Sequence, residues 1–126
     1  MLVVLLALIE YFALGALTGR ARVKYRIAAP AVTGHPMFER YFRVHQNSLE
    51  QLIVFLPAVW LFGLYVSAPW AAIVGAAFLV ARILYAIGYV AAPERREVGA
   101  VLTFLIEAIL VIGALGGVIR SIALAR

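Results

Sequence analysis

Residues 98–119 read VGAVLTFLIEAILVIGALGGVI, an apolar stretch in which Glu107 is the single charged residue. A helix needs about 20 consecutive apolar residues to cross the hydrocarbon core of a bilayer. The stretch therefore predicts a transmembrane helix, and three stretches of the same kind precede it. Together they predict helices over about residues 2–22, 38–66, 70–91 and 97–121.

The composition is that of a membrane protein rather than of a water-soluble one. Hydrophobic residues make up 66% of the 126 residues and charged residues 13%, whereas soluble domains are about half apolar. Four spans and short connections use the whole chain, so we expect a single domain over residues 1–126. The expected fold is all-α, an up-down bundle of four transmembrane helices. In its last helix, Gly113 and Gly117 form a GxxxG pair that permits close helix approach.

Basic residues gather on one side of the predicted membrane. Residues 20–26, at the end of the first helix and just beyond it, include four basic side chains, and Arg95 and Arg96 lie between the third and fourth helices. The positive-inside rule makes this side cytoplasmic and places both termini on the opposite side. Membrane topology thus accounts for the net charge of +5, and we expect no nucleic-acid partner.

The chemistry available to the chain is restricted because it contains no cysteine. A thiol nucleophile of the protein itself is therefore excluded, and any sulfur chemistry must use a small-molecule thiol. The two histidines have no cluster of other ligand residues around them in the sequence. We accordingly expect no metal site.

A polar stripe follows one face of the second predicted helix. Its members share a spacing of i, i+3, i+7 and i+10, which confines them to an arc of about 80°; they are Arg40, Arg43, Asn47 and Glu50. Guanidinium groups could bind the carboxylates of a peptide-like ligand while Glu50 accepts from its ammonium group. The alternative is an interfacial helix end whose charges pair with each other and with lipid phosphates. His45 lies on another face, toward a neighbouring helix or subunit.

A second stripe follows the third predicted helix, where Arg82, Tyr85 and Tyr89 share one face. Arg82 lies so deep in its span that its charge needs a partner, and we favour a structural ion pair. The tyrosine hydroxyls could donate to a ligand thiol or carboxylate, although membrane tyrosines are most often packing or interface residues.

Two carboxylates, Glu10 and Glu107, lie well inside apolar spans. An unpaired charge there costs on the order of 3 kcal/mol. Each could be a proton or cation site, but pairing with Arg82 is the simpler explanation. Glu50 is a third candidate partner for that arginine.

Two motifs, FERYFRVHQNSLE over residues 38–50 and RILYAIGY over residues 82–89, carry a family resemblance. Read together, they resemble the MAPEG family of membrane-associated glutathione enzymes. The HQNSLE core and the RILYAIGY segment look most like the microsomal glutathione transferase branch. Similarity in hydropathy and loop placement covers nearly the whole chain, which looks like a bacterial member.

The resemblance implies a homotrimer of four-helix protomers, here in a bacterial inner membrane. Glutathione, the co-substrate, would lie between neighbouring subunits near the cytoplasmic face, with a lipophilic substrate arriving from the membrane. Side chains of the second and third helices, with some from their surroundings, would bind glutathione. The residues expected to do so are Arg22, Arg40, Arg43, His45, Asn47, Glu50, Tyr85 and Tyr89.

The family also has an arginine just after the third helix that stabilises the glutathione thiolate. Arg96 fits this catalytic position by its distance from Tyr89, and adjacent Arg95 is the alternative because the intervening loop varies in length. A neighbouring guanidinium lowers the pKa of the thiol from its usual value of about 8.5. The resemblance therefore implies a detoxifying glutathione transferase or a peroxidase acting on lipid hydroperoxides.

Two other functions stay open. Relatives that form leukotrienes carry an arginine pair after the first helix, whereas here Arg22 is followed by Val23. This departure argues against a leukotriene synthase. It also leaves room for a family member that binds a lipid without catalysis. A small multidrug-type, proton-coupled transporter could use Glu10 as its lone carboxylate. That function gives no reason for the polar stripe of the second helix.

Overall fold

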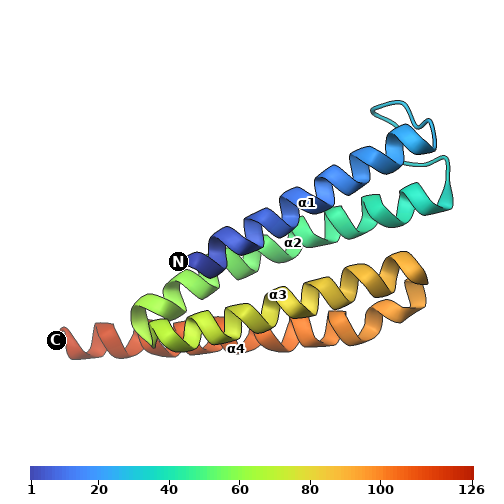
Figure 1. The fold of residues 1–126 in the computed structure, drawn as a ribbon. Coiled ribbons are helices and arrows are strands. Elements are labelled where there is room, and N and C mark those ends of the chain that lie inside the picture. Colours follow the sequence, from blue (N-terminus) through green and yellow to red (C-terminus); the bar gives the residue numbers. More distant parts are fainter.

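The computed structural model describes residues 1–126 as four long helices in an up-down arrangement (Figure 1). The elements are α1 (Leu2–Lys24), α2 (Pro36–Tyr65), α3 (Ala68–Ala91), the short 3-10 helix η1 (Pro93–Arg96) and α4 (Glu97–Leu124). The connection between α1 and α2 and the turn at η1 lie at one end of the bundle, which we call the basic end. Both chain termini and the turn between α2 and α3 lie at the opposite end.

All four helices are long and apolar enough to cross a membrane. Large apolar side chains cover the outside of the bundle; Phe12, for example, is 80% exposed and Phe104 is 70% exposed. An outer surface of this kind is stable in hydrocarbon and not in water. The protein is therefore an integral, multi-pass membrane protein.

Two helices begin earlier than the sequence predicts, and each has a proline in its first turn. The predicted second helix begins at residue 38, but α2 begins at Pro36, where the His35 side chain caps it by accepting from the Met37 N–H at 3.1 Å. Ser67 likewise accepts from the N–H of Trp70 at 3.3 Å and caps α3, which begins before the predicted residue 70. Proline suits the first helical turn because its missing N–H would have no partner there.

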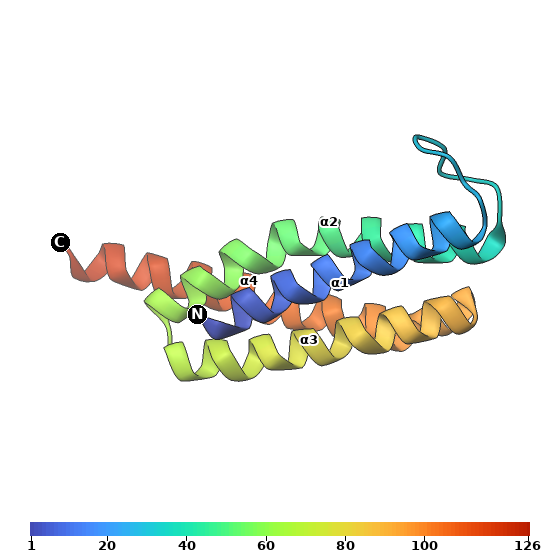
Figure 2. The same cartoon turned by 45° about the horizontal axis from the view of Figure 1, so that its top comes forward.

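The helices α2 and α3 join through aromatic stacking in the middle of the bundle. The rings of Phe55 and Phe78 stack with centroids 3.7 Å apart, and neither side chain is more than 1% exposed. Both α1 and α4 pack on α2 and α3. A view turned about the horizontal axis shows α4 continuing past the turn between α2 and α3 (Figure 2).

Glycines of α4 bring that helix close to the end of α2. A Cβ atom at Gly113 would meet the Phe62 ring, and a Cβ atom at Gly117 would lie 2.7 Å from the carbonyl oxygen of Tyr65. The close approach predicted from the GxxxG pair is confirmed, with α2 as the partner. Small residues of this kind let helix backbones meet where hydrophobic burial gives little driving force.

The adjacent glycines of α4 provide a matched test of this packing. Gly117→Ala places a methyl group against the Tyr65 carbonyl, so we expect it to lower the free energy of unfolding by about 1–3 kcal/mol. A Cβ at Gly116 meets no atom within 4 Å, so Gly116→Ala should leave stability unchanged or slightly higher. Thermal unfolding in detergent compares the two variants, and equal stabilities would contradict the described contact.

Candidate functional site

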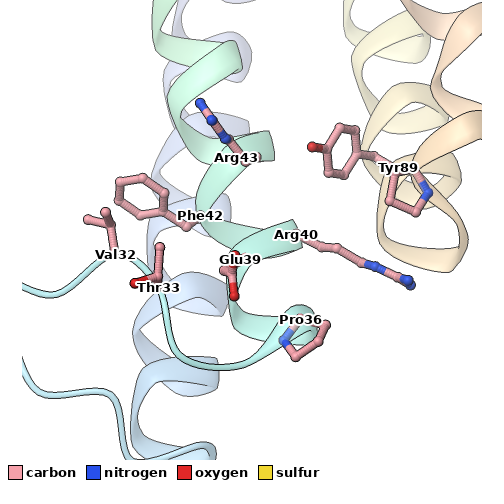
Figure 3. Close-up of a pocket in the computed structure, with 9 residues that line it drawn as sticks. Val32, Thr33, Pro36, Glu39, Arg40, Phe42, Arg43 and Tyr89 are labelled. Carbon is pink, nitrogen blue, oxygen red and sulfur yellow. The ribbon is translucent and has the colours of Figure 1, made fainter.

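Two pockets follow the seam between α2 and α3 at the basic end. The first, which we call the rim pocket, has a volume of about 520 Å³ and includes Arg40, Arg43 and Tyr89 in its lining (Figure 3). The second, the interhelical pocket, has a volume of about 320 Å³ and lies between α2, α3 and the start of α4. Its polar lining consists of Asn47, Glu50, Gln51, Arg82, Tyr85, Arg96 and Thr103. Both volumes suit a small-molecule ligand.

Helical spacing relates the linings of the two pockets. Asn47 lies one turn after Arg43 on α2, and Tyr85 lies one turn before Tyr89 on α3. Each pair therefore points along the same side of its helix, with one member in each pocket. The two polar stripes predicted from the sequence thus face a common seam.

A hydrogen bond joins the stripes directly. The side-chain nitrogen of Asn47 donates to the hydroxyl oxygen of Tyr85 at 2.6 Å, and Tyr85 is buried. A phenol both donates and accepts, so accepting from Asn47 leaves the hydroxyl proton of Tyr85 free for another group. The ring of Tyr89 lies 5.8 Å from that of Tyr85, centroid to centroid, and continues the wall toward the rim.

Arg82 lines the interhelical pocket and is 4% exposed. It donates to the hydroxyl of Ser48 at 3.0 Å, and its guanidinium carbon lies 4.1 Å from the centre of the Tyr85 ring. Its Nε has no hydrogen-bond partner. In the protomer the neighbours of the guanidinium are a hydroxyl and an aromatic face rather than a carboxylate, and the ion pair expected from the sequence stays a prediction.

Two of the carboxylates considered as partners of Arg82 have different surroundings. With its amide nitrogen turned toward Glu107, Gln51 donates to both carboxylate oxygens at 2.8 Å. Glu10 shares with Arg82 a hollow of about 10 Å³, roughly the space of one water molecule.

Two glycines bring the turn after α3 close to the pockets. A Cβ atom at Gly88 would lie 2.6 Å from the carbonyl oxygen of Arg95, and one at Gly99 would lie 2.6 Å from the backbone of Tyr85. The chain therefore folds back tightly, and the guanidinium of Arg96 comes to 5.9 Å from the centre of the Tyr89 ring. Arg96 is exposed and lines the interhelical pocket, whereas Arg95 lines neither pocket.

Arg40 has a structural task at the end of α3. Its Nη1 donates to the carbonyl oxygens of Val90 at 3.0 Å and Ala91 at 3.2 Å, which have no partner within the helix. Figure 3 shows the side chain reaching from α2 toward this helix end, while Arg43 does not. Arg40, which the sequence predicts to bind the ligand, thus already donates to backbone carbonyls, although it still lines the rim pocket.

The structure places Arg22 and His45 outside both pockets. Arg22 donates to the carbonyl oxygens of Ile27 at 3.4 Å and Ala31 at 2.7 Å, so it orders the connection between α1 and α2. The ring of His45 stacks on Tyr11 of α1 with centroids 4.5 Å apart. His45 therefore meets a neighbouring helix, as its position off the polar stripe predicts, and neither residue lines the rim pocket or the interhelical pocket.

Some lining residues are absent from the sequence prediction. Gln51 lies four residues after Asn47, so the helical spacing that defines the stripe could have included it. Thr103 and Phe104 come from α4, and no local pattern relates them to α2. Their place in the pocket follows only from the close packing of α4 on α3 at Gly99.

Comparison with known proteins gives matches over most of the chain. Residues 1–116 match the family model described as MAPEG family. An uncharacterized protein of Synechocystis sp. is 51% identical over 114 residues, covering 90% of this chain and 83% of that protein. Microsomal glutathione S-transferase 2 of Homo sapiens is 42% identical over 108 residues, which are 85% of this chain and 72% of that protein. Leukotriene C4 synthase of Cavia porcellus is 36% identical over 86 residues, covering 68% and 56% of the two chains.

The different surroundings of the two α2 arginines lead to a stability prediction. Arg40→Ala removes the donor to two end carbonyls of α3, so we expect it to lower the free energy of unfolding by about 1–2 kcal/mol. Arg43→Ala, one turn away and exposed, should change stability by less than about 0.5 kcal/mol. Thermal unfolding of the two variants in the same detergent measures the difference. A larger loss for Arg43→Ala would contradict the structural role given to Arg40.

Proposed function

Because this chain belongs to the MAPEG family, we propose that it is a membrane-bound glutathione transferase. The observation that carries the proposal is the interhelical pocket, where an amide, a carboxylate, a phenol and two guanidinium groups from three helices face one space. Glutathione offers complementary groups: two carboxylates, an ammonium group, peptide bonds and a thiol. The pocket and the rim pocket beside it together have room for an extended tripeptide.

The proposed binding roles follow from the charge of each side chain. Arg43 is free of internal hydrogen-bonded partners, unlike Arg40, and is suited to bind a carboxylate of glutathione. Glu50 is exposed at the pocket edge and would accept from the ammonium group. Tyr85 would donate the hydroxyl proton that its bond with Asn47 leaves free. Tyr89 would form the wall between the two pockets.

Arg96 is the proposed activating residue because it is a cation at the pocket that has no carboxylate or carbonyl acceptor in the protomer. A free thiol with a pKa of about 8.5 is mostly protonated at neutral pH. A guanidinium beside the sulfur favours the thiolate electrostatically and lowers that pKa. Arg95 is the less suitable candidate, since it lies outside the pocket.

The thiolate would then react with a lipophilic electrophile. In the transferase reaction a carbon–sulfur bond forms while the leaving group departs with the electron pair of its broken bond. In the peroxidase reaction the sulfur attacks the peroxide oxygen, and the other oxygen leaves as an alcohol after protonation; a second glutathione then gives the disulfide and water. Phe104 lines the pocket yet is 70% exposed on the outer surface, which supports entry of the substrate from the bilayer.

The proposal includes a homotrimer in a bacterial inner membrane, with the pockets on the cytoplasmic side. Support for the side comes from the basic residues at the end of α1 and in η1, which lie at the same end as the pockets. Support for the oligomer comes from the shape of the site, since both pockets open on the surface of the protomer. A neighbouring subunit would close them and exclude water from the thiolate.

The other two functions have less support. A transporter needs a path to its carboxylate, but the hollow that Glu10 shares with Arg82 has a volume of about 10 Å³, and the chain resembles glutathione transferases. A lipid-binding member without catalysis would keep the fold and lack thiol activation. Measurement of thiolate formation separates it from a transferase.

The role of Arg96 can be tested through the ionisation of bound glutathione. We expect Arg96→Ala to lower the thiolate signal in ultraviolet absorption and the rate of aryl halide conjugation at pH 7 by about tenfold or more, because the thiol loses its neighbouring cation. The cation lowers the pKa of the bound thiol, so the activity of the wild-type protein should rise over a lower pH range than the activity of the variant. The variant should follow the ordinary thiol pKa of about 8.5.

Arg95→Ala and Arg126→Ala serve as matched controls with the same loss of charge. Both should keep wild-type thiolate formation, because neither residue lines the pocket. If Arg95→Ala alone removes the thiolate, the activating residue is misassigned. If the wild-type protein itself forms no thiolate and conjugates no aryl halide above background, the transferase proposal fails.

A further inference from the structure

A third pocket lies at the basic end, between α1 and the start of α2. It has a volume of about 200 Å³ and shares no lining residue with the rim or interhelical pockets. Its lining includes Leu17, Arg20, Lys24, Tyr25, Met37 and Tyr41. We call it the basic pocket, and nothing in the glutathione chemistry uses it.

Helical spacing brings two cations to this pocket. Leu17, Arg20 and Lys24 are spaced i, i+3 and i+7, which places them on one face of α1. The charged group of Lys24 lies 5.4 Å from the centre of the Tyr25 ring. Arg22 donates to carbonyl oxygens of the connection between α1 and α2. Arg20 and Lys24 make no such hydrogen bonds, so their charges are available to a ligand. The lining contains no carboxylate, so the pocket favours an anion.

The lining of the basic pocket changes from polar to apolar along the axis of α1. Lys24 lies seven residues beyond Leu17, or about 10 Å along the helix axis. Leu17 marks the apolar side, and it is 41% exposed, as is Leu6, which lies three turns earlier on the same face of α1. An anionic group between Arg20 and Lys24 would thus be followed by hydrocarbon chains along α1, as in a phospholipid.

Contacts around the pocket hold its walls in place. Tyr25 stacks on His35 with ring centroids 3.8 Å apart, which fixes the connection above the pocket. The hydroxyl of Thr18, which lies 2.8 Å from the carbonyl oxygen of Leu14 in its own helix, is also 3.2 Å from that of Tyr41, so α1 and α2 are in contact beside the pocket. A preformed site of this kind loses little conformational entropy on binding.

We propose that the basic pocket binds the headgroup of an anionic phospholipid, with its phosphate between Arg20 and Lys24 and its acyl chains along Leu17. The bound lipid would hold the end of α1 against α2. This site is independent of the proposed glutathione chemistry, because it involves other side chains on another face of α2.

The test uses the full chain in vesicles of phosphatidylcholine alone or with added phosphatidylglycerol. We expect phosphatidylglycerol to raise the thermal unfolding temperature of the wild-type protein, because it binds the folded state. The double variant Arg20→Gln, Lys24→Gln should unfold like the wild type in neutral vesicles and lose at least half of the increase. The matched control Arg120→Gln, Arg126→Gln removes the same charge at the opposite end of the chain and should keep the increase. Native mass spectrometry should detect fewer bound phosphatidylglycerol molecules on the first variant only.

Three results would overturn the proposal. An equal loss in both double variants would mean diffuse attraction to charge rather than a site. A full increase retained by Arg20→Gln, Lys24→Gln would place the lipid elsewhere. Equal stabilisation by inorganic phosphate in neutral vesicles would mean a free-anion site. If the double variant does not fold, the single variants Arg20→Gln and Lys24→Gln are compared in the same way, and an undiminished increase in both contradicts the site.

Discussion

The absence of water inside a bilayer is the constraint on which the rest of this structure depends. A polar side chain in the hydrocarbon must find a partner in the protein. Here the polar groups of α2 and α3 find each other: Asn47 donates to Tyr85, and Arg82 donates to Ser48. These bonds set the rotation of the two helices so that both polar stripes face one seam. The pockets at the basic end are a consequence of that orientation.

The arginines around this seam have different roles. Arg22 and Arg40 satisfy backbone carbonyls of a connection and of a helix end, and Arg82 is held by a hydroxyl and an aromatic ring. Arg43 and Arg96 line the pockets with their charges available. The structural arginines order the site, and the available ones are suited to an anionic ligand. This division gives physical grounds for glutathione binding by Arg43 and thiol activation by Arg96.

The sequence predicts the spans and the polar faces because both follow from local patterns. Length and hydropathy identify four helices, and the spacing of 3.6 residues per turn aligns Arg43 with Asn47 and Tyr85 with Tyr89. Helical spacing does not distinguish the roles of Arg40 and Arg43. Only the position of the last carbonyl groups of α3 determines that Arg40 is the one that donates to them. The sequence also does not identify Ser48 as the hydrogen-bond partner of Arg82, since that contact depends on how α2 and α3 pack.

The most direct test of the central idea is a structure determined with glutathione bound in lipid or detergent. We predict an extended tripeptide along the seam between α2 and α3, with its sulfur beside the guanidinium of Arg96 and its carboxylate at Arg43. A tripeptide bound away from this seam would contradict the assignment. So would a sulfur distant from Arg96 with Asn47 and Tyr85 bonded only to each other, since the polar stripes would then have a structural role alone.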